Sequence, residues 1–251
     1  MGTFQKCILI PMLVLVGIYT PVARAGPPFI TDDPDPTDYK HWEVYLFADY
    51  YRIDGADQGQ FPAMEINYGL LPNMQLHVIP AVAYDHQPGE VSHYGIGDTE
   101  FGVKYRFVQE TDTIPEIGVF PLLEFPSGNA DHGLGNGKLQ VFAPVWLQKT
   151  FGKDKEWTTF GGGGFWYNPG PDHRNFFRLG WALQRDFSEH ITLGAEIYHE
   201  SAASRDVGGH TAFNIGGYYN FDDHNHLLMS AGRDIDGPDR FACYAAYQIT
   251  F

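Results

Sequence analysis

His199 and Ser201 stand two residues apart, and their types match those of a general base and a nucleophile. A hydroxyl attacks an ester when an imidazole takes its proton and a carboxylate orients the ring. Glu200 lies between the two residues and points to the opposite face of an extended chain, so another strand would have to supply that carboxylate. Lipid hydrolysis at this pair is therefore an alternative to a simpler interpretation, in which polar residues mark the end of a strand.

Two other clusters have the residue types of metal ligands. The run from Thr31 to Pro36 contains Asp32, Asp33 and Asp35 but lacks the glycine and the terminal acid of an EF-hand loop. His224 and His226 could bind zinc, although turn chemistry explains Asp222 to His226 equally simply. We interpret the first cluster as a solvated, proline-stiffened lead-in and the second as a turn, and we expect neither a metal nor another cofactor.

The run Gly161-Gly162-Gly163-Gly164 does not predict a phosphate-binding loop. Such loops open a helix, whereas Phe165-Trp166-Tyr167 continues a strand pattern here. A flexible or closely approached strand is the expected structure. Four residues without side chains leave open which of them face inward.

The N-terminus has the features of an exported protein. Lys6 precedes an apolar stretch from Cys7 to Tyr19, and Ala23-Arg24-Ala25 provides the small residues of a cleavage site. The stretch is shorter than the roughly 20 residues of a membrane-spanning helix. Cys7 lies at the start of this stretch and not at its end, which argues against a lipoprotein signal. We predict a signal peptide over residues 1–25, cleaved after Ala25; a retained anchor is the alternative.

Cleavage would change both the charge and the cysteine content of the chain. The removed segment carries two basic residues and no acidic one, so the formal net charge moves from −15 to −17. A chain this acidic is repelled by phosphates, which argues against nucleic acid as a partner. Cys243 becomes the only cysteine, so the mature chain can form no intramolecular disulfide.

The elements that must position these residues are strands. After Ala25 no convincing 3.6-residue period appears, but apolar and polar residues alternate in segment after segment, most clearly over 99–107. This pattern predicts about twelve strands near 41–53, 61–71, 73–85, 98–109, 115–126, 138–150, 157–167, 176–186, 191–200, 211–221, 226–234 and 240–251. Their lengths suit tilted strands that cross a bilayer.

The connections between these strands alternate in length. Short ones lie at 71–73, 109–114, 152–156, 187–190 and 222–225, and longer ones at 54–60, 86–97, 126–137, 168–175, 201–210 and 235–239. The difference is modest for the first and the last of the longer set. Outer-membrane barrels have short periplasmic turns and longer outer loops, and an even strand number leaves both termini on the periplasmic side. We therefore predict an all-β, antiparallel up-and-down transmembrane barrel over 41–251, preceded by a periplasmic lead-in over 26–40.

The last strand is a separate indication. Phe251 shares one face with Ile249, Tyr247 and Phe241, whereas Tyr244 and Gln248 occupy the other face. An aromatic last residue preceded by alternating apolar residues resembles the signature that the barrel-assembly machinery recognises. A soluble protein with such an edge would risk aggregation, whereas barrel closure pairs it.

Bilayer physics assigns the faces, because lipid-facing positions must be apolar. The polar set of each strand then faces a lumen, and it contains the candidate pore-lining residues Glu65, Glu100, Lys104, Arg106, Glu116, Glu124, Arg178 and Glu196. The hairpin 98–109/115–126 suggests a register that places Arg106 beside Glu116. Aromatic residues on the same face are Phe47, Phe120, Phe142, Trp146, Tyr198, Tyr218 and Tyr244.

A set of motifs extends over the whole mature chain: Gly26 to Pro34, His41 to Glu43, Asn73 to Val78, Gly97 to Phe107, Gly118 to Pro121, Trp146 to Lys149, Gly161 to Gly164, Asn168 to Pro171, Phe221 to Leu228 and Ala246 to Phe251. Together these motifs resemble the outer-membrane transporter family named for the MetA pathway of phenol degradation. The resemblance implies a barrel that passes small aromatic compounds. It assigns no role to any single residue.

The expected function is passive or facilitated passage of a small, aromatic or hydrophobic solute through a narrow lumen in the outer membrane. Eight strands just fill a barrel and sixteen leave an aqueous channel, so twelve enclose modest space. Aromatic residues among charges of both signs suit either an amphipathic solute or a mostly filled interior. A closed structural or envelope-response barrel is therefore the second hypothesis, and outer-membrane lipid is the expected surrounding partner of both.

Overall fold

The computed structural model describes residues 27–251. The predicted signal peptide over 1–25 lies outside the described residues. Within 27–251 the sole helix is a short 3-10 turn at Ala130–His132, and no helix there has the length and apolar character to cross a membrane.

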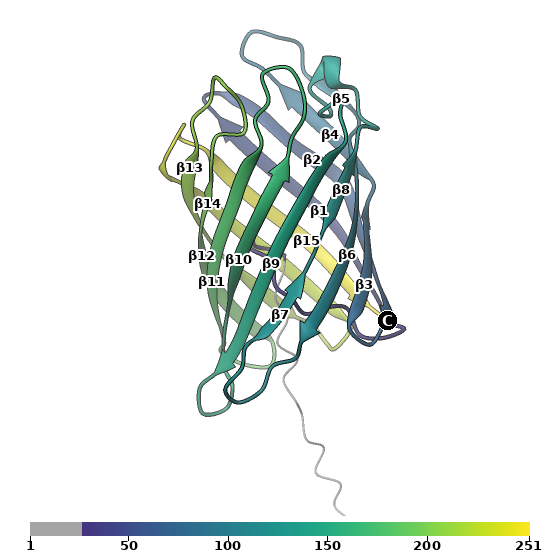
Figure 1. Ribbon diagram of the computed structural model, residues 1–251, viewed down its shortest axis with the longest axis vertical. Helices are drawn as coiled ribbons and strands as arrows, with labels where there is room; N and C mark the ends of the chain where they lie inside the picture. The colour runs from purple at the N-terminus through teal and green to yellow at the C-terminus, as the bar shows by residue number, and fades with distance from the viewer. Residues whose placement is uncertain (1–26) are drawn as a thin grey trace, which may run out of the picture.

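The described chain is otherwise built from antiparallel strands that form one 15-stranded sheet. Neighbours in sequence pair in space, and β1 pairs with both β2 and β15, so the sheet closes into a barrel of steeply tilted strands (Figure 1). The strands are β1 Trp42–Ile53, β2 Ala56–Leu71, β3 Met74–Ile79, β4 Ala81–His86, β5 His93–Ile96, β6 Thr99–Val108, β7 Glu116–Val119, β8 Leu122–Phe125, β9 Gln140–Phe151, β10 Trp157–Tyr167, β11 Phe176–Asp186, β12 Ile191–Glu200, β13 His210–Asn220, β14 Asn225–Asp236 and β15 Phe241–Thr250.

Three of the strands that cross the barrel are each interrupted once, so the fifteen strand segments form twelve barrel strands. Pro80 separates β3 from β4, Gly97-Asp98 separates β5 from β6, and Phe120-Pro121 separates β7 from β8. Proline lacks the N–H that a central strand donates to its neighbour, which explains two of the breaks. The prediction of about twelve strands is confirmed, and the breaks are an addition to it.

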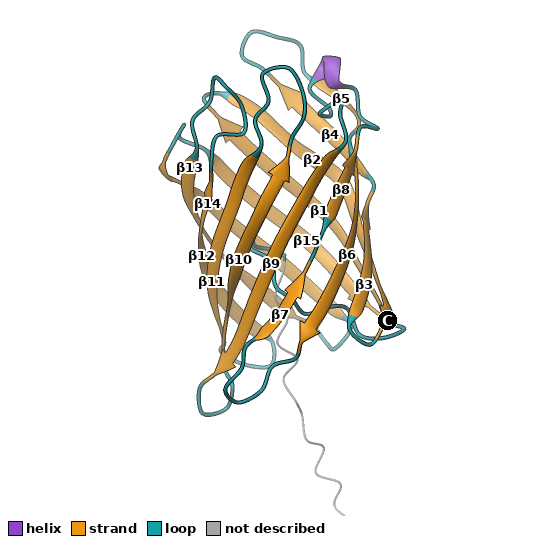
Figure 2. Cartoon of the chain, viewed as in Figure 1, coloured by secondary structure: helices purple, strands orange, loops and turns teal. Residues whose placement is uncertain are grey.

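Short turns and longer loops gather at opposite ends of the barrel (Figure 2). We call the end with the C-terminus the turn end and the other the loop end. The predicted loop over 54–60 is wrong, because β1 and β2 continue to a tight turn at Asp54 and Gly55, whose φ angles are 51° and 87°. Positive φ at both positions matches the type I′ turn of a β-hairpin, for which Asp-Gly is a preferred sequence.

The barrel closes through its first and last strands. Ten residue pairs join β1 to β15, and beyond them Trp42 N donates to Phe251 O at 2.7 Å while Phe251 N donates to Trp42 O at 3.0 Å. The apolar terminal edge is thereby paired, as barrel closure requires.

The two faces of the wall differ as predicted. Apolar side chains on the outer face are exposed, such as Leu193 (52%) and Ile197 (51%), whereas Glu196 between them is 4% exposed. In the glycine-containing strand β10, Phe160 and Trp166 are buried at 0% and 6%. Alternation from these two residues places Gly162 and Gly164 on the inner face and so resolves the phase that the sequence left open.

Candidate functional site in the barrel lumen

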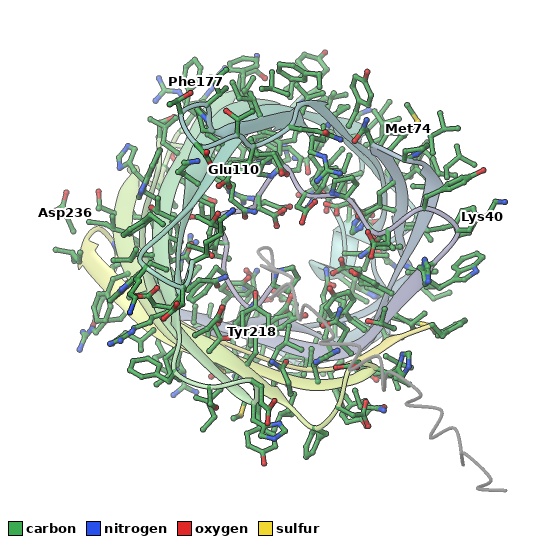
Figure 3. The ribbon with its side chains drawn as sticks, turned by 90° about the horizontal axis from the view of Figure 1, so that it is seen from below. Lys40, Met74, Glu110, Phe177, Tyr218 and Asp236 are labelled. Carbon is green, nitrogen blue, oxygen red and sulfur yellow. The ribbon has the colours of Figure 1, made fainter. Side chains whose placement is uncertain are left out.

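Most of the lead-in, residues 27–37, lies inside the barrel toward the turn end, whereas Lys40 stands at the outer rim (Figures 1 and 3). Thr31 and Asp33 are exposed by only 1% and 0%. The prediction of a solvated lead-in is therefore wrong. The reason is chemical, because the inner face of the wall presents groups that pair with this acidic segment.

Two basic side chains of β6 hold the aspartates of the lead-in. Lys104 Nζ lies 2.9 Å from Asp32 Oδ1 and 3.5 Å from Asp33 Oδ2. Arg106 pairs with Asp35 of the lead-in and, at 3.3 Å, with Glu116 of β7. Buried charges are tolerated when they are paired in this way. The predicted contact between Arg106 and Glu116 is confirmed, and the lead-in joins it.

A carboxylate of β12 holds the earlier part of the lead-in. Glu196 accepts the backbone N–H of Ile30 at 2.8 Å and that of Thr31 at 2.7 Å, one on each oxygen. Hydrogen bonds to a charged acceptor are worth roughly 1.5–3 kcal/mol each. Phe29 packs on Phe160, with ring centroids 6.2 Å apart. Polar and apolar contacts thus fix the same short segment.

Glycines on the inner face provide the space that the lead-in occupies. A Cβ atom at Gly180 would lie 2.1 Å from Thr31 Oγ1, and one at Gly118 would lie 2.9 Å from Pro34 Cβ. Both distances are too short for real contacts, so larger residues at these positions would push the lead-in away. We call the inner side of β3, β6, β7, β11 and β12, where the lead-in docks, the covered wall.

A chain of hydrogen bonds runs along the inner face of the wall from β2 through β3 to β6. Asn67 Nδ2 donates to Glu65 Oε1 at 2.8 Å, and the two ring nitrogens of His77 lie 2.7 Å from Asn67 Oδ1 and 2.8 Å from Glu100 Oε1. Glu124 of β8 stands opposite Glu100 in the strand register. Three of the predicted acidic residues therefore share one region, and sequence reasoning missed the His77 that links two of them.

Toward the loop end, Arg178 joins charge and aromatic groups. Its Nε lies 2.6 Å from Glu200 Oε1, and its guanidinium carbon lies 5.7 Å and 5.6 Å from the ring centroids of Phe142 and Trp166. These two rings stack at 4.8 Å, within a buried cluster that also contains Phe120, Leu122, Trp146 and Phe176. The lumen thus contains a cluster of aromatic rings next to a guanidinium group that is paired with a carboxylate. Glu200 was not among the predicted site residues, although its inward phase could have shown it.

A pocket opens at the turn end between the lead-in and the opposite side of the barrel. Its side chains come from the lead-in, the start of β1, β13 and the end of β15, and Tyr218 is seen on the inner side of the wall in Figure 3, with Phe177 on the outer side. We call the inner side of β1 and β15, with Tyr218, the open wall. The lining residues are Pro27, Asp35, Pro36, Thr37, Asp38, His41, Glu43, Tyr45, Tyr218, Gln248 and Thr250.

Burial changes the acidity of the docked aspartates. It raises the pKa of Asp35 to about 6, against the opposing effect of the Arg106 guanidinium. It raises the pKa of Asp33 well above its ordinary value, against the opposing charge of Lys104. In both cases the cost of removing a carboxylate from water is the largest cause.

The residues considered for other chemistry have separate partners. His199 Nδ1 lies 2.9 Å from Thr211 Oγ1, and Ser201 Oγ accepts the N–H of Phe177 at 2.9 Å, so the two are not engaged with each other as a base and a nucleophile would be. His224 and His226 hydrogen-bond to Thr250 O and Asn220 Oδ1. Asp222 accepts the N–H of His224 at 2.8 Å, which is turn chemistry. Residues 27–251 contain no group of three or more side chains placed to hold a metal ion.

The comparisons with known proteins agree with this architecture. Residues 41–251 match the family model described as "Putative MetA-pathway of phenol degradation". None of the curated protein sequences matches the chain.

Several solved structures share the fold. The COG4313 outer membrane channel from Pseudomonas putida F1 is 14% identical, with a TM-score of 0.70 over 91% of this chain and 100% of that one. The KdgM porin in complex with disordered oligogalacturonate is 10% identical, with a TM-score of 0.56 over 82% and 99%. The NanC porin is 9% identical, with a TM-score of 0.57 over 82% and 98%.

Proposed function

Because the chain belongs to the family described as "Putative MetA-pathway of phenol degradation", we propose that it is a passive outer-membrane channel for small solutes, including aromatic ones. The solved structures of the same fold are named as an outer membrane channel and as porins. Passage needs no catalytic group, and the separate partners of His199 and Ser201 agree with this.

The observation that carries the proposal is that the lead-in docks on the wall from β3 to β12 and, through Pro28, on Ser230 of β14, but leaves a pocket in front of β1 and β15. This pocket lies at the turn end. Along the interior, aromatic clusters stand beside charged pairs, a lining that can contact both the ring and the polar group of a phenol. We assign the candidate pore-lining residues to this passage, with Lys104, Arg106 and Glu196 acting through the lead-in that they hold and Glu116 acting through Arg106.

The orientation follows from the ends of the barrel. Short turns and the C-terminus share one end, which we place in the periplasm, and the longer loops then face outward. We further propose that the terminal strand ending at Phe251 is the segment that the assembly machinery recognises. A solute would enter between the loops and leave through the pocket beside the lead-in.

Flux through the reconstituted protein tests the proposal. Vesicles should carry lipopolysaccharide in the outer leaflet, because a plain lipid bilayer already passes small phenols. We expect the protein to raise the flux of phenol more than that of a pentose sugar. A barrel that passes neither phenol, sugar nor ions would contradict the channel and favour the closed structural barrel.

A matched pair of variants locates the passage. Thr250 lines the pocket, whereas Ile249 is 37% exposed on the outer face. Thr250→Trp should narrow the pocket and lower the flux, and Ile249→Trp should leave it unchanged, since tryptophan is favourable near the membrane interface. Equal flux in both variants would show that solutes do not leave by this pocket.

A further inference from the structure

Within residues 27–251, the basic side chains that reach the lumen, Lys104, Arg106, Arg178 and Arg240, each lie within 4.0 Å of a carboxylate. Lys104 is held by Asp32 and Asp33, and Arg106 pairs with Asp35 and Glu116. Toward the loop end, Glu200 lies within 2.6 Å of Arg178 and within 4.0 Å of Arg240. A negative solute that enters the lumen therefore meets cations that are already occupied.

Several carboxylates remain without such a partner. Within residues 27–251, no lysine or arginine nitrogen lies within 4.0 Å of Asp38, Glu43, Asp49 or Glu124. Asp49 accepts the N–H of Gln60 at 2.7 Å, and Glu43 accepts the hydroxyl of Tyr45 at 3.1 Å. Glu124 faces another carboxylate, Glu100, across the strand pair. The lumen thus carries an excess of negative charge, which low-dielectric walls concentrate.

At the turn-end pocket, carboxylates without a basic partner face the space that a solute would occupy. Asp38 and Glu43 line it, and no lysine or arginine does. The pocket also contains an uncommitted donor, because Gln248 is 1% exposed and its Nε2 has no hydrogen-bond partner among the described residues. A buried amide N–H without a partner costs free energy that a visiting acceptor atom would recover.

We infer that the turn-end pocket is a charge filter, with Asp38 and Glu43 repelling carboxylates and Gln248 donating to the hydroxyl or carbonyl oxygen of a neutral solute. Acidic side chains around a narrow passage select for cations in the same way. A phenol is neutral at neutral pH, since phenolic hydroxyls ionise near pH 10. A benzoate is charged and is excluded. This inference rests on the proposed channel function and adds the class of solute that the channel accepts.

The reversal potential of the purified, full-length protein in a planar bilayer under a KCl gradient tests the filter. We expect wild type to prefer K⁺ over Cl⁻. The double variant Asp38→Asn/Glu43→Gln should shift the reversal potential toward zero. The control Glu189→Gln/Asp223→Asn removes the same charge from exposed positions in the turns at the same end, outside the pocket, and should leave the reversal potential unchanged. Heat-modified mobility in gel electrophoresis confirms that each variant is folded.

Flux in lipopolysaccharide-containing vesicles supplies a second readout. Wild type should pass phenol faster than benzoate, and the double variant should raise benzoate flux while phenol flux stays the same. Gln248→Leu should lower phenol flux without changing the reversal potential. Currents without cation preference, or a preference that the double variant keeps, would overturn the filter and leave the channel standing. The absence of both currents and flux would overturn the channel itself.

Discussion

The covered wall and the open wall of the lumen differ in whether their buried charged side chains have partners of opposite charge. On the covered wall each basic side chain meets a carboxylate of the lead-in or of the wall, and glycines make room for the segment. Beside the open wall, Glu43 of β1 and Asp38 of the lead-in have no basic partner within 4.0 Å in the described chain, and both line the turn-end pocket. The lead-in thus fills one part of the lumen and leaves a pocket beside β1 and β15.

This difference shows that the sequence specifies the position of the lead-in as closely as it specifies the strands of the barrel wall. The lead-in is not a loose tail, because Glu196, Lys104 and Arg106 contact it at successive points. Three paired carboxylates and two backbone N–H groups are satisfied only when it is docked. Breaking the covered wall should therefore open the lumen, whereas removing the charges of Asp38 and Glu43 beside the open wall should alter selectivity alone.

Deletion of the lead-in should have the largest effect on this contrast. A variant without residues 27–37 loses the covered side of the obstruction while keeping every strand. Twelve strands enclose more space than side chains alone fill, so we expect single-channel conductance to rise several-fold. Planar-bilayer recordings measure it, and heat-modified gel mobility confirms the fold. Unchanged conductance would mean that the docked lead-in does not limit passage.

A single substitution should produce a smaller change in the same direction. Gly180→Leu places a side chain where a Cβ atom already lies 2.1 Å from Thr31 Oγ1, so the lead-in must move away from the wall. Conductance should rise, though less than after the deletion, because Lys104 and Arg106 still hold the aspartates. Gly208→Leu is the control, since Gly208 has no atom within 4 Å of its Cβ position. Equal conductance in wild type and both variants would contradict the fit of the lead-in to Gly180.

The smallest expected effect is a dependence of stability on pH at Asp35. Its pKa is raised from 3.8 to about 6 in the folded protein, so its contribution favours the folded state below 3.8 and is lost as the pH rises to about 6. The melting temperature of wild type relative to Asp35→Asn should therefore fall between about pH 4 and about pH 7. A constant difference between the two proteins across this range would show that Asp35 is not titrating there.

The sequence predicted the wall of the barrel well because the wall is governed by a short-range pattern. Alternation with period two determines both faces of a strand, so residues such as Glu65 and Glu196 could be placed inside from their neighbours alone. The contact between Arg106 and Glu116 followed from one hairpin. The tight turn at Asp54 and Gly55 also has a sequence signal, since Asp-Gly is strongly preferred in hairpins. The predicted loop is wrong because the residues after the turn are polar, although they belong to β2.

The docked lead-in could not be found in this way. Asp32 and Lys104 are separated by 72 positions and Thr31 and Glu196 by 165, and no local pattern reports such pairs. Two signals in the sequence were nevertheless present. Inward glycines such as Gly118 and Gly180 leave space that a lumen of this size does not otherwise need, and the acidic run at 32–35 complements the inward Lys104 and Arg106.

These separations also set an order of events during folding. The C-terminal half of the lead-in can meet β3, β6 and β7 as soon as those strands pair, whereas Pro28 must wait for Ser230, 202 positions away in β14. Contacts so distant in sequence form late because closing the intervening chain costs entropy. The segment therefore settles into place progressively, from its junction with β1 toward Pro27, and the lumen reaches its final width only as the last strands are added.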